Sequence, residues 1–145
     1  MFERILVLCT GNICRSPMAA AVLRQRLQAK SQPADIRSAG IGAMTGHPAE
    51  EPAQALMRAR GLDISSHRAQ QVNHDLLRWA QLIFVMEPYQ RDAVLAMDPT
   101  LRGKVFLLGH WIGESIPDPY QQEQAAYEKA LALIDHALDA WMDKL

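Results

Sequence analysis

The first part of this chain places a short apolar segment, a small loop and a helix start directly after one another, and this order limits the possible folds. Residues 4–8 are typical of a buried strand, and residues 16–23 are typical of a helix. The loop between them begins at Cys9 and runs to Arg15, so a thiol and a guanidinium stand at its two ends. A strand, a tight loop and a helix start together predict an anion site.

The residues of this loop fit that geometry. Ser16 is a strong N-cap candidate, and Pro17 suits the first helical position because it has no amide hydrogen to leave unpaired. We therefore expect the helix to begin at Ser16. Gly11 and Asn12 tolerate left-handed backbone conformations, which aim successive N–H groups inward. Such a nest of donors, backed by the helix dipole, can hold an oxyanion such as phosphate.

The two ends of the loop carry the chemistry. Converging N–H donors and a nearby cation stabilise a thiolate, so we expect Cys9 to be ionised and nucleophilic. Arg15 can hold two phosphoryl oxygens at once with its planar fork of donors, whereas lysine would supply a point charge. In the alternative interpretation, Cys9 is a buried strand-end cysteine and Arg15 a surface charge. We rank that alternative lower, because a C-x5-R spacing rarely falls between a strand and a helix by chance.

A covalent phosphoryl transfer also needs an acid for the leaving group and later a base for water. Asp118 is the best candidate, since Pro117 and Pro119 prevent a helix and present its carboxylate from a stiff loop. A simple turn aspartate explains the same pattern equally well. The other acidic residues are weaker candidates, because they recur along a solvated helix face or lack such a loop: Asp135, Asp139, Asp143, Glu87, Asp92 and Asp98.

The rest of the chain alternates strand-like and helical segments. We expect strands at residues 34–38, 81–86 and 104–108, and helices at residues 50–60, 73–80 and 88–97. A last helix is predicted by apolar side chains that recur every three or four residues, namely Tyr127, Leu131, Ile134, Leu138, Trp141 and Leu145. This alternation predicts an α/β fold, a single-domain doubly wound parallel sheet of about four strands with helices on both faces. Ligands of such sheets bind beyond the carboxyl ends of the strands, where Cys9 lies.

Composition narrows the class of protein. A chain of 145 residues with 49% hydrophobic residues has enough material for one ordinary domain, residues 1–145. The formal net charge is −1 and the basic residues are scattered, so we expect no nucleic-acid partner. No apolar run approaches membrane-span length and no signal-peptide arrangement precedes the first strand, so we expect a cytoplasmic protein without membrane insertion. The two cysteines both lie in the loop, which excludes a zinc cluster or disulfide framework built from cysteine.

Four short motifs lie in a fixed order along nearly the whole chain: residues 7–17 (VLCTGNICRSP), 38–40 (SAG), 66–69 (SHRA) and 118–120 (DPY). In order, spacing and chain length they resemble the low-molecular-weight protein tyrosine phosphatases. The resemblance implies that Cys9 forms a phosphocysteine, that Arg15 clamps the phosphate and that Asp118 serves as general acid and then base. It also implies a mechanism with no metal and no cofactor.

The same resemblance assigns supporting roles. It implies that the loop residues surround the substrate phosphate, and these are Thr10, Gly11, Asn12, Ile13, Cys14 and Ser16. It also implies that Asn12, Ser16, Ser38 and His67 form a hydrogen-bond network that holds the loop in its strained shape. Simpler roles would also explain two of these residues: Ser16 could serve only as a helix cap, and His67 could be an ordinary structural histidine.

The entrance of the site is the part where this chain departs from one branch of the family. Tyr120 matches the aromatic residue that forms one wall, although ordinary packing would also explain it. The opposite wall comes from residues 41–47, which contain no aromatic residue, so we assign Met44 to it. In lacking an aromatic residue here, the chain resembles the bacterial branch of the family, whose members tend to act on tyrosine kinases of exopolysaccharide export. The expected partner is therefore a tyrosine-phosphorylated protein such as a bacterial tyrosine autokinase.

Cys14 suggests redox protection, because a sulfenic acid on Cys9 could be captured by it as a reversible disulfide. Simple packing of Cys14 under the loop is an equally good interpretation. Two other activities use related features. An arsenate reductase on the same scaffold needs further downstream cysteines, which this chain lacks, and a nucleotide-binding protein needs a G-x-x-x-x-G-K motif, which is absent. A non-catalytic phosphotyrosine reader stays possible, although Asp118 argues against it.

Overall fold

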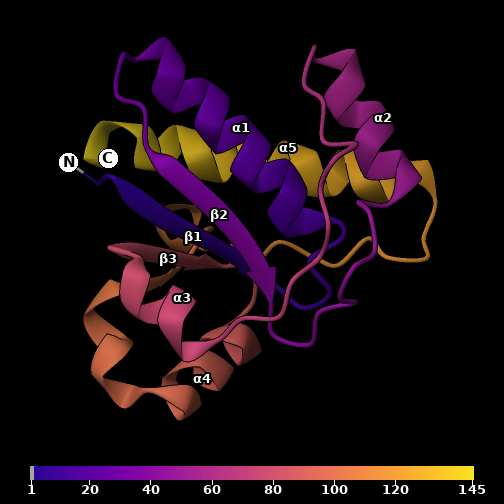
Figure 1. Ribbon diagram of the computed structural model, residues 1–145. Helices are drawn as coiled ribbons and strands as arrows, with labels where there is room; N and C mark the ends of the chain where they lie inside the picture. Colours follow the sequence, from indigo (N-terminus) through magenta and orange to yellow (C-terminus); the bar gives the residue numbers. More distant parts are fainter. Residues whose placement is uncertain (1) are drawn as a thin grey trace.

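Four parallel strands form the centre of the molecule in the computed structural model, which describes residues 2–145 (Figure 1). The strands are β1 (Arg4–Cys9), β2 (Asp35–Gly40), β3 (Leu82–Val85) and β4 (Val105–Leu107). Their order across the sheet is β2-β1-β3-β4, and every neighbouring pair is parallel. β1 and β3 are nearly continuous apolar runs, as expected for parallel strands whose two faces are both covered.

Helices cover both faces of this sheet. They are α1 (Arg15–Ala29), α2 (Glu51–Ala59), α3 (His74–Trp79), α4 (Pro88–Met97) and α5 (Gln124–Trp141), with short 3-10 helices at Pro99–Lys104, His110–Ile112 and Met142–Lys144. Figure 1 shows α1 and α5 on one face and α3 and α4 on the other, with α2 beside α1 and α5. The doubly wound α/β fold expected from the sequence is therefore confirmed.

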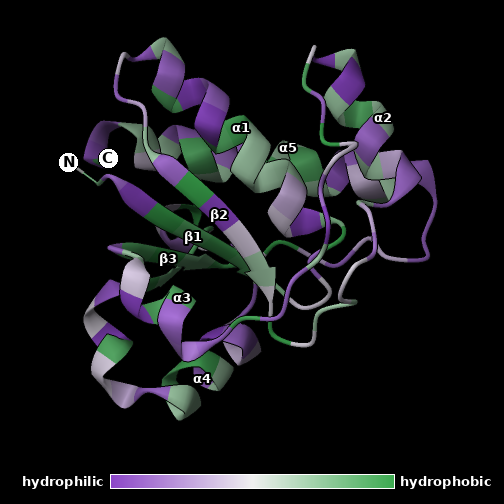
Figure 2. Ribbon diagram, in the orientation of Figure 1, coloured by the Kyte–Doolittle hydropathy of each residue, from purple (hydrophilic) through white to green (hydrophobic). Residues whose placement is uncertain are grey.

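Alternation along β1 builds the two halves of the core. Ile5 and Val7 belong to the hydrophobic cluster under α1 and α5, whereas Leu6 and Leu8 belong to the cluster under α3 and α4. All four side chains are at most 1% exposed. In Figure 2 the hydrophobic colour concentrates on β1 and β3, while the helices carry hydrophilic outer faces. The molecule thus buries the strand that leads into the Cys9 loop on both sides.

All predicted elements exist. The strands, together with α2, α3 and α4, end within two residues of the expected bounds, whereas α1 continues six residues beyond residue 23. The helix predicted at residues 88–97 is α4 with the same ends, and Asn73 caps α3 by accepting a hydrogen bond from the amide of Leu76. The apolar stripe of α5 is buried as predicted, except that Leu145 lies beyond the helix and only partly packs on the core. The 3-10 helix at Pro99–Lys104 is absent from the sequence expectation.

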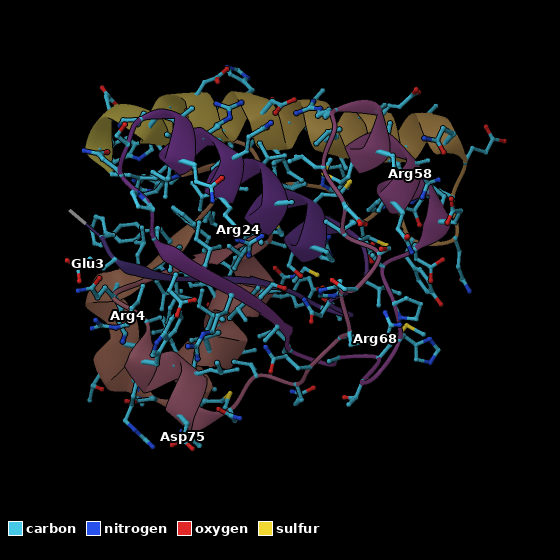
Figure 3. The ribbon with its side chains drawn as sticks, turned by 45° about the horizontal axis from the view of Figure 1, so that its top comes forward. Glu3, Arg4, Arg24, Arg58, Arg68 and Asp75 are labelled. Carbon is cyan, nitrogen blue, oxygen red and sulfur yellow. The ribbon has the colours of Figure 1, made fainter. Side chains whose placement is uncertain are left out.

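Charged side chains are distributed around the whole fold. Those labelled in Figure 3 come from the start of β1 and the residue before it, from α1, α2 and α3 and from the loop before α3, which agrees with the scattered basic residues of the sequence. Across residues 2–145, none of the helices has the length and apolar character needed to cross a membrane.

Candidate active site

The loop of residues 9–14 lies at the point where the sheet topology reverses. From β1 the chain goes to β2 on one side, and from β2 it crosses over to β3 on the other side of β1, so the Cys9 loop leaves the carboxyl end of β1 at this switch. A pocket of about 160 Å³ opens there. Its lining consists of Cys9, Thr10, Gly11, Ile13, Cys14, Arg15, Gly42, Met44, Asp118 and Tyr120. Residues more than 100 positions apart in the sequence therefore meet at this pocket.

The carbonyl groups of the loop are bound from outside. Five successive carbonyl oxygens, those of residues 9–13, accept hydrogen bonds from neighbouring segments at 2.7 to 3.0 Å. Their donors are, in order, the amides of Ile41, Gly42 and Met44, the imidazole Nε2 of His67 and the amide of Glu50. Because a peptide unit is planar, fixing each carbonyl outward leaves the amide of the same unit directed the other way.

The amide groups of the loop are correspondingly free for an anion. Within residues 2–145, the only amide of residues 10–14 that donates to a protein atom is that of Asn12, whose acceptor is Cys9 Sγ at 3.3 Å. Buried N–H groups normally find an acceptor. This cup of donors, placed before the amino terminus of α1, is a ready site for a phosphoryl group.

Asn12 holds the loop in an uncommon conformation. Its φ of 60° lies in the left-handed region, and the side chain is fully buried. Oδ1 accepts from the amide of Gln70 at 2.9 Å, and Nδ2 donates to Ser16 Oγ at 2.8 Å and to Ser38 Oγ at 3.0 Å. Gly11, which could also tolerate a left-handed conformation, has a negative φ.

Ser16 does not cap the helix. α1 begins at Arg15 with Cys14 in the capping position, so Ser16 already lies in the first turn. Its hydroxyl is instead 2.9 Å from Cys9 Sγ. Because the oxygen accepts from Asn12, the hydroxyl proton is available for the sulfur. The cap prediction fails because a polar partner from the tertiary fold competes with the helix end for this hydroxyl.

Arg15 is fully enclosed rather than a surface charge, with 1% exposure. It donates to the carbonyl of Ile116 at 2.7 Å, forms a close ion pair with Glu87 and lies 3.7 Å from the carboxylate of Asp118. Burial disfavours its charge, but Cys9, Asp118 and Glu87 outweigh that effect and raise the pKa of Arg15. The guanidinium is therefore a permanent cation beside the pocket.

The first turn of α4 supports both ends of the loop, and sequence reasoning missed it. Glu87 pairs with Arg15 at one end. At the other end, the fully buried amide of Gln90 donates to Thr10 Oγ1 at 3.0 Å, and the hydroxyl of Tyr89 also contacts Thr10. From the sequence alone, Glu87 is only a weaker candidate for the general acid. The sequence feature that could have indicated this role is the capping box of Glu87 and Gln90. It directly follows a buried strand, β3, whose carboxyl end lies beside that of β1.

The entrance is formed by residues from two distant loops. Asp118 is 47% exposed, and its Oδ1 accepts from the amide of Tyr120 at 3.0 Å, which fixes the carboxylate at the rim. Tyr120 and Met44 both line the pocket. Asn12, Ser16, Ser38 and His67 do not line it, and instead support the loop from behind.

Two further titratable groups are perturbed by burial. Burial lowers the pKa of His67 below its usual 6.5, and its hydrogen bond to Asn12 O offsets this in part. Since the partner is a carbonyl oxygen, Nε2 carries the proton. Burial raises the pKa of Cys14 to about 12, against a hydrogen bond from Tyr127 that lowers it. Cys14 is thus a neutral thiol at pH 7, 3.5 Å from Tyr127 Oη.

Known proteins share this arrangement over the whole chain. A family model described as low molecular weight phosphotyrosine protein phosphatase matches residues 4–145. A probable low molecular weight protein-tyrosine-phosphatase, EpsP of Ralstonia solanacearum, is 46% identical over 145 residues, which is 100% of this chain and 97% of that protein.

Solved structures are similar to the same extent. The tyrosine phosphatase Wzb from Escherichia coli K30, in complex with sulphate, has a TM-score of 0.91 and 38% identity over 99% of both chains. Wzb of Vibrio vulnificus, in complex with benzylphosphonate, has a TM-score of 0.92 and 39% identity over 100% of both chains.

Proposed function

Because the chain belongs to the low molecular weight phosphotyrosine protein phosphatase family and is a protein-tyrosine phosphatase, we propose that it hydrolyses phosphotyrosine through a phosphocysteine on Cys9. The observation that carries these roles is the meeting of three groups at one pocket. Cys9 Sγ lies below a cup of amides, Arg15 lies beside it, and the Asp118 carboxylate stands at the rim. Both cysteines of the chain line this pocket, together with the buried guanidinium of Arg15.

In the first step the thiolate of Cys9 attacks phosphorus in line with the tyrosine oxygen. A sulfur–phosphorus bond forms and the phosphorus–oxygen bond to the phenol breaks. Arg15 and the loop amides bind the equatorial oxygens, where negative charge is concentrated. Asp118, protonated at this stage, gives its proton to the leaving phenolate.

In the second step the same carboxylate acts as a base. Asp118 takes a proton from a water molecule, whose oxygen attacks phosphorus while the sulfur–phosphorus bond breaks. Inorganic phosphate leaves and Cys9 is again a thiolate. The hydroxyl of Ser16 stabilises that anion as the leaving group, since it lies 2.9 Å from the sulfur.

Hydrolysis of p-nitrophenyl phosphate and of a phosphotyrosine peptide tests these roles. We expect Cys9→Ser to abolish both activities. Asp118→Ala should lower kcat for the peptide by about 10²–10⁴, because tyrosine, with a pKa near 10, is a poor leaving group without a proton. The loss should be smaller for p-nitrophenyl phosphate, whose phenolate needs little protonation.

Asp143→Ala is the matched control, since Asp143 is 81% exposed in the 3-10 helix Met142–Lys144 and does not line the pocket. It should leave both activities unchanged. Equal losses for the two substrates in Asp118→Ala would contradict the acid role. Tight binding of the peptide by the wild type without turnover would instead favour a phosphotyrosine reader.

We further propose a cytoplasmic tyrosine autokinase of polysaccharide export as the protein substrate. Two observations support this proposal. Met44 rather than an aromatic residue forms one wall of the entrance, as in the bacterial branch of the family, and the chain is similar to bacterial relatives. The enzyme should remove phosphate from such a kinase, purified in its autophosphorylated form, and Cys9→Ser should not. Unchanged phosphotyrosine on the kinase after treatment with active enzyme would rule this substrate out.

We also propose that Cys14 protects Cys9 during oxidation. Peroxide converts the Cys9 thiolate into a sulfenic acid. Cys14 then attacks that sulfur as its thiol proton passes to the departing hydroxide, so that a disulfide and water form. Both cysteines are free and buried in the structure. Activity should return with a thiol reductant after mild peroxide in the wild type, but not in Cys14→Ala. Equal recovery in both would leave simple packing of Cys14 as the better interpretation.

A further inference from the structure

A second pocket, of about 110 Å³, lies along β4, the edge strand of the sheet. The basic residues of its lining come from three elements: Arg91 of α4, Arg102 of the 3-10 helix Pro99–Lys104, and His110 at the start of the 3-10 helix His110–Ile112. Val105, Phe106 and Leu107 of β4 form its floor. No carboxylate lines this pocket, so it is basic although the whole chain has a formal net charge of −1.

The basic groups of this pocket have no counter-charge. Among residues 2–145, Arg91, Arg102 and His110 form no ion pair, and their side chains make no hydrogen bond. Most other arginines of the chain do bind a carboxylate or a carbonyl group. The Nε–H of Arg91 is moreover buried without an acceptor, which is rare for a buried polar group. An anion in the pocket would supply the missing acceptor.

The position of the pocket connects it to the active site. Arg91 directly follows Gln90, which donates to Thr10 of the catalytic loop, and His110 follows the carboxyl end of β4. The active-site loop follows the carboxyl end of β1, two strands away, which corresponds to roughly 10 Å across the sheet. An extended peptide covers about 3.3–3.6 Å per residue. A group three to six residues from the reacting phosphotyrosine could therefore reach the basic pocket.

We propose that this pocket binds a second phosphoryl group, carried by the same polypeptide substrate as the phosphotyrosine in the active site. Two arginines and a histidine line this one small pocket, and their N–H groups suit the several oxygens of a phosphoryl group. The β4 residues that line it offer apolar contacts to the ring of a tyrosine side chain. The protein would thus select multiply phosphorylated segments. This inference rests on the proposed hydrolysis of phosphotyrosine peptides.

The test compares peptides with one phosphotyrosine and peptides with two, separated by two, four or six residues. We expect kcat/KM of the wild type to be about tenfold higher for the best doubly phosphorylated peptide than for the single one. Arg102→Gln should abolish this ratio and leave hydrolysis of p-nitrophenyl phosphate and of the single peptide unchanged. Arg91→Gln should act in the same way. Arg78→Gln is the matched control, since Arg78 is 63% exposed on α3 and lies outside the pocket.

Each other outcome decides against the proposal. A ratio near one in the wild type, or a ratio unchanged in both variants, would overturn it. Inorganic phosphate should also shift the NMR signals of His110, and a spectrum unchanged by phosphate would contradict an anion site in this pocket. A peptide with glutamate at the second position should show no preference, and an equal preference would replace phosphoryl by carboxylate recognition. Failure of the wild type on every phosphotyrosine peptide, with p-nitrophenyl phosphate still hydrolysed, would instead refute the proposed substrate class.

Discussion

At the scale of single residues, Asn12 combines two separate contributions to the loop. Its left-handed backbone is tolerated by asparagine and glycine, and its side-chain amide makes three hydrogen bonds. Sequence reasoning predicted the left-handed backbone because asparagine is enriched there. The three hydrogen bonds require Gln70, Ser16 and Ser38 to lie close together in the fold. Nothing in the sequence pattern indicates Gln70 as one of these partners.

Substitutions at Asn12 separate these contributions. Asn12→Ala should lower the free energy of unfolding by about 2–4 kcal/mol, since it loses the bonds and adds left-handed strain. Asn12→Gly should cost about 1 kcal/mol less, because glycine carries no such strain. Urea unfolding of both variants measures the difference. Equal losses would mean that strain at this position is negligible.

His67 makes stability depend on pH. Because burial lowers its pKa in the folded protein, the unfolded chain takes up the proton first as pH falls. The contribution of neutral His67 to the free energy of unfolding is therefore complete above about pH 6.5, the unfolded pKa. It is lost as the pH falls through the lower pKa of the folded protein.

Urea midpoints between pH 7.5 and pH 5 test this, with His67→Gln as reference, since glutamine can still donate to Asn12 O. The variant should lose less stability across that range than the wild type. Identical pH profiles would show that His67 does not titrate differently on folding.

At the scale of elements, the end of β2 lies against the catalytic loop without any space for a side chain. A Cβ on Gly40 would stand 2.4 Å from the carbonyl oxygen of Thr10 and 3.1 Å from Ala43. The sequence motif contained this glycine, but only the register of β1 with β2, which pairs Cys9 with Gly40, gives the reason. Such pairing is a long-range property that local patterns do not carry.

Gly40→Ala should therefore destabilise the protein by about 1–3 kcal/mol or more, because backbone rather than a movable side chain blocks the methyl group. Phosphatase activity should fall as well, since the loop must shift. Gly103→Ala is the control: nothing lies within 4 Å of its Cβ, so stability should stay within about 0.5 kcal/mol. Thermal unfolding and turnover of p-nitrophenyl phosphate report the two effects, and a silent Gly40→Ala would contradict the close approach.

Elements with strong local signals were predictable, and those set by neighbours were not. α4 has Pro88 at its start and a buried strand before it, so its ends could be read from the chain. The support that its first turn gives to Thr10 and Arg15 could not, since it depends on β3 lying beside β1. The same applies to Ser16, whose local role as a cap yields to a distant partner.

At the scale of the whole molecule, anion binding should be linked to global stability. The catalytic loop and Arg15 contact α4, the Asp118 loop and the segments before α2 and α3. A ligand that binds only the folded form therefore stabilises all of these segments together. Inorganic phosphate at 100 times its Kd should add about 2.7 kcal/mol. For a chain of this size that raises Tm by roughly 5–10 °C.

Differential scanning calorimetry with and without phosphate measures this shift, and sulphate, which is bound in the similar Wzb structure, should act in the same direction. Arg15→Ala should remove most of the shift, whereas Arg58→Ala, an exposed residue of α2, should keep it. A full shift in Arg15→Ala would place the anion elsewhere.

The segment from Ile41 to Met44 has two roles at once, and this has an evolutionary consequence. Its amides donate hydrogen bonds to the carbonyl groups of the catalytic loop, and its last side chain lines the substrate entrance. Lengthening or shortening this stretch would loosen the phosphate cradle itself, so new substrate preferences are accessible by exchanging the Met44 side chain but not by remodelling the backbone that carries it.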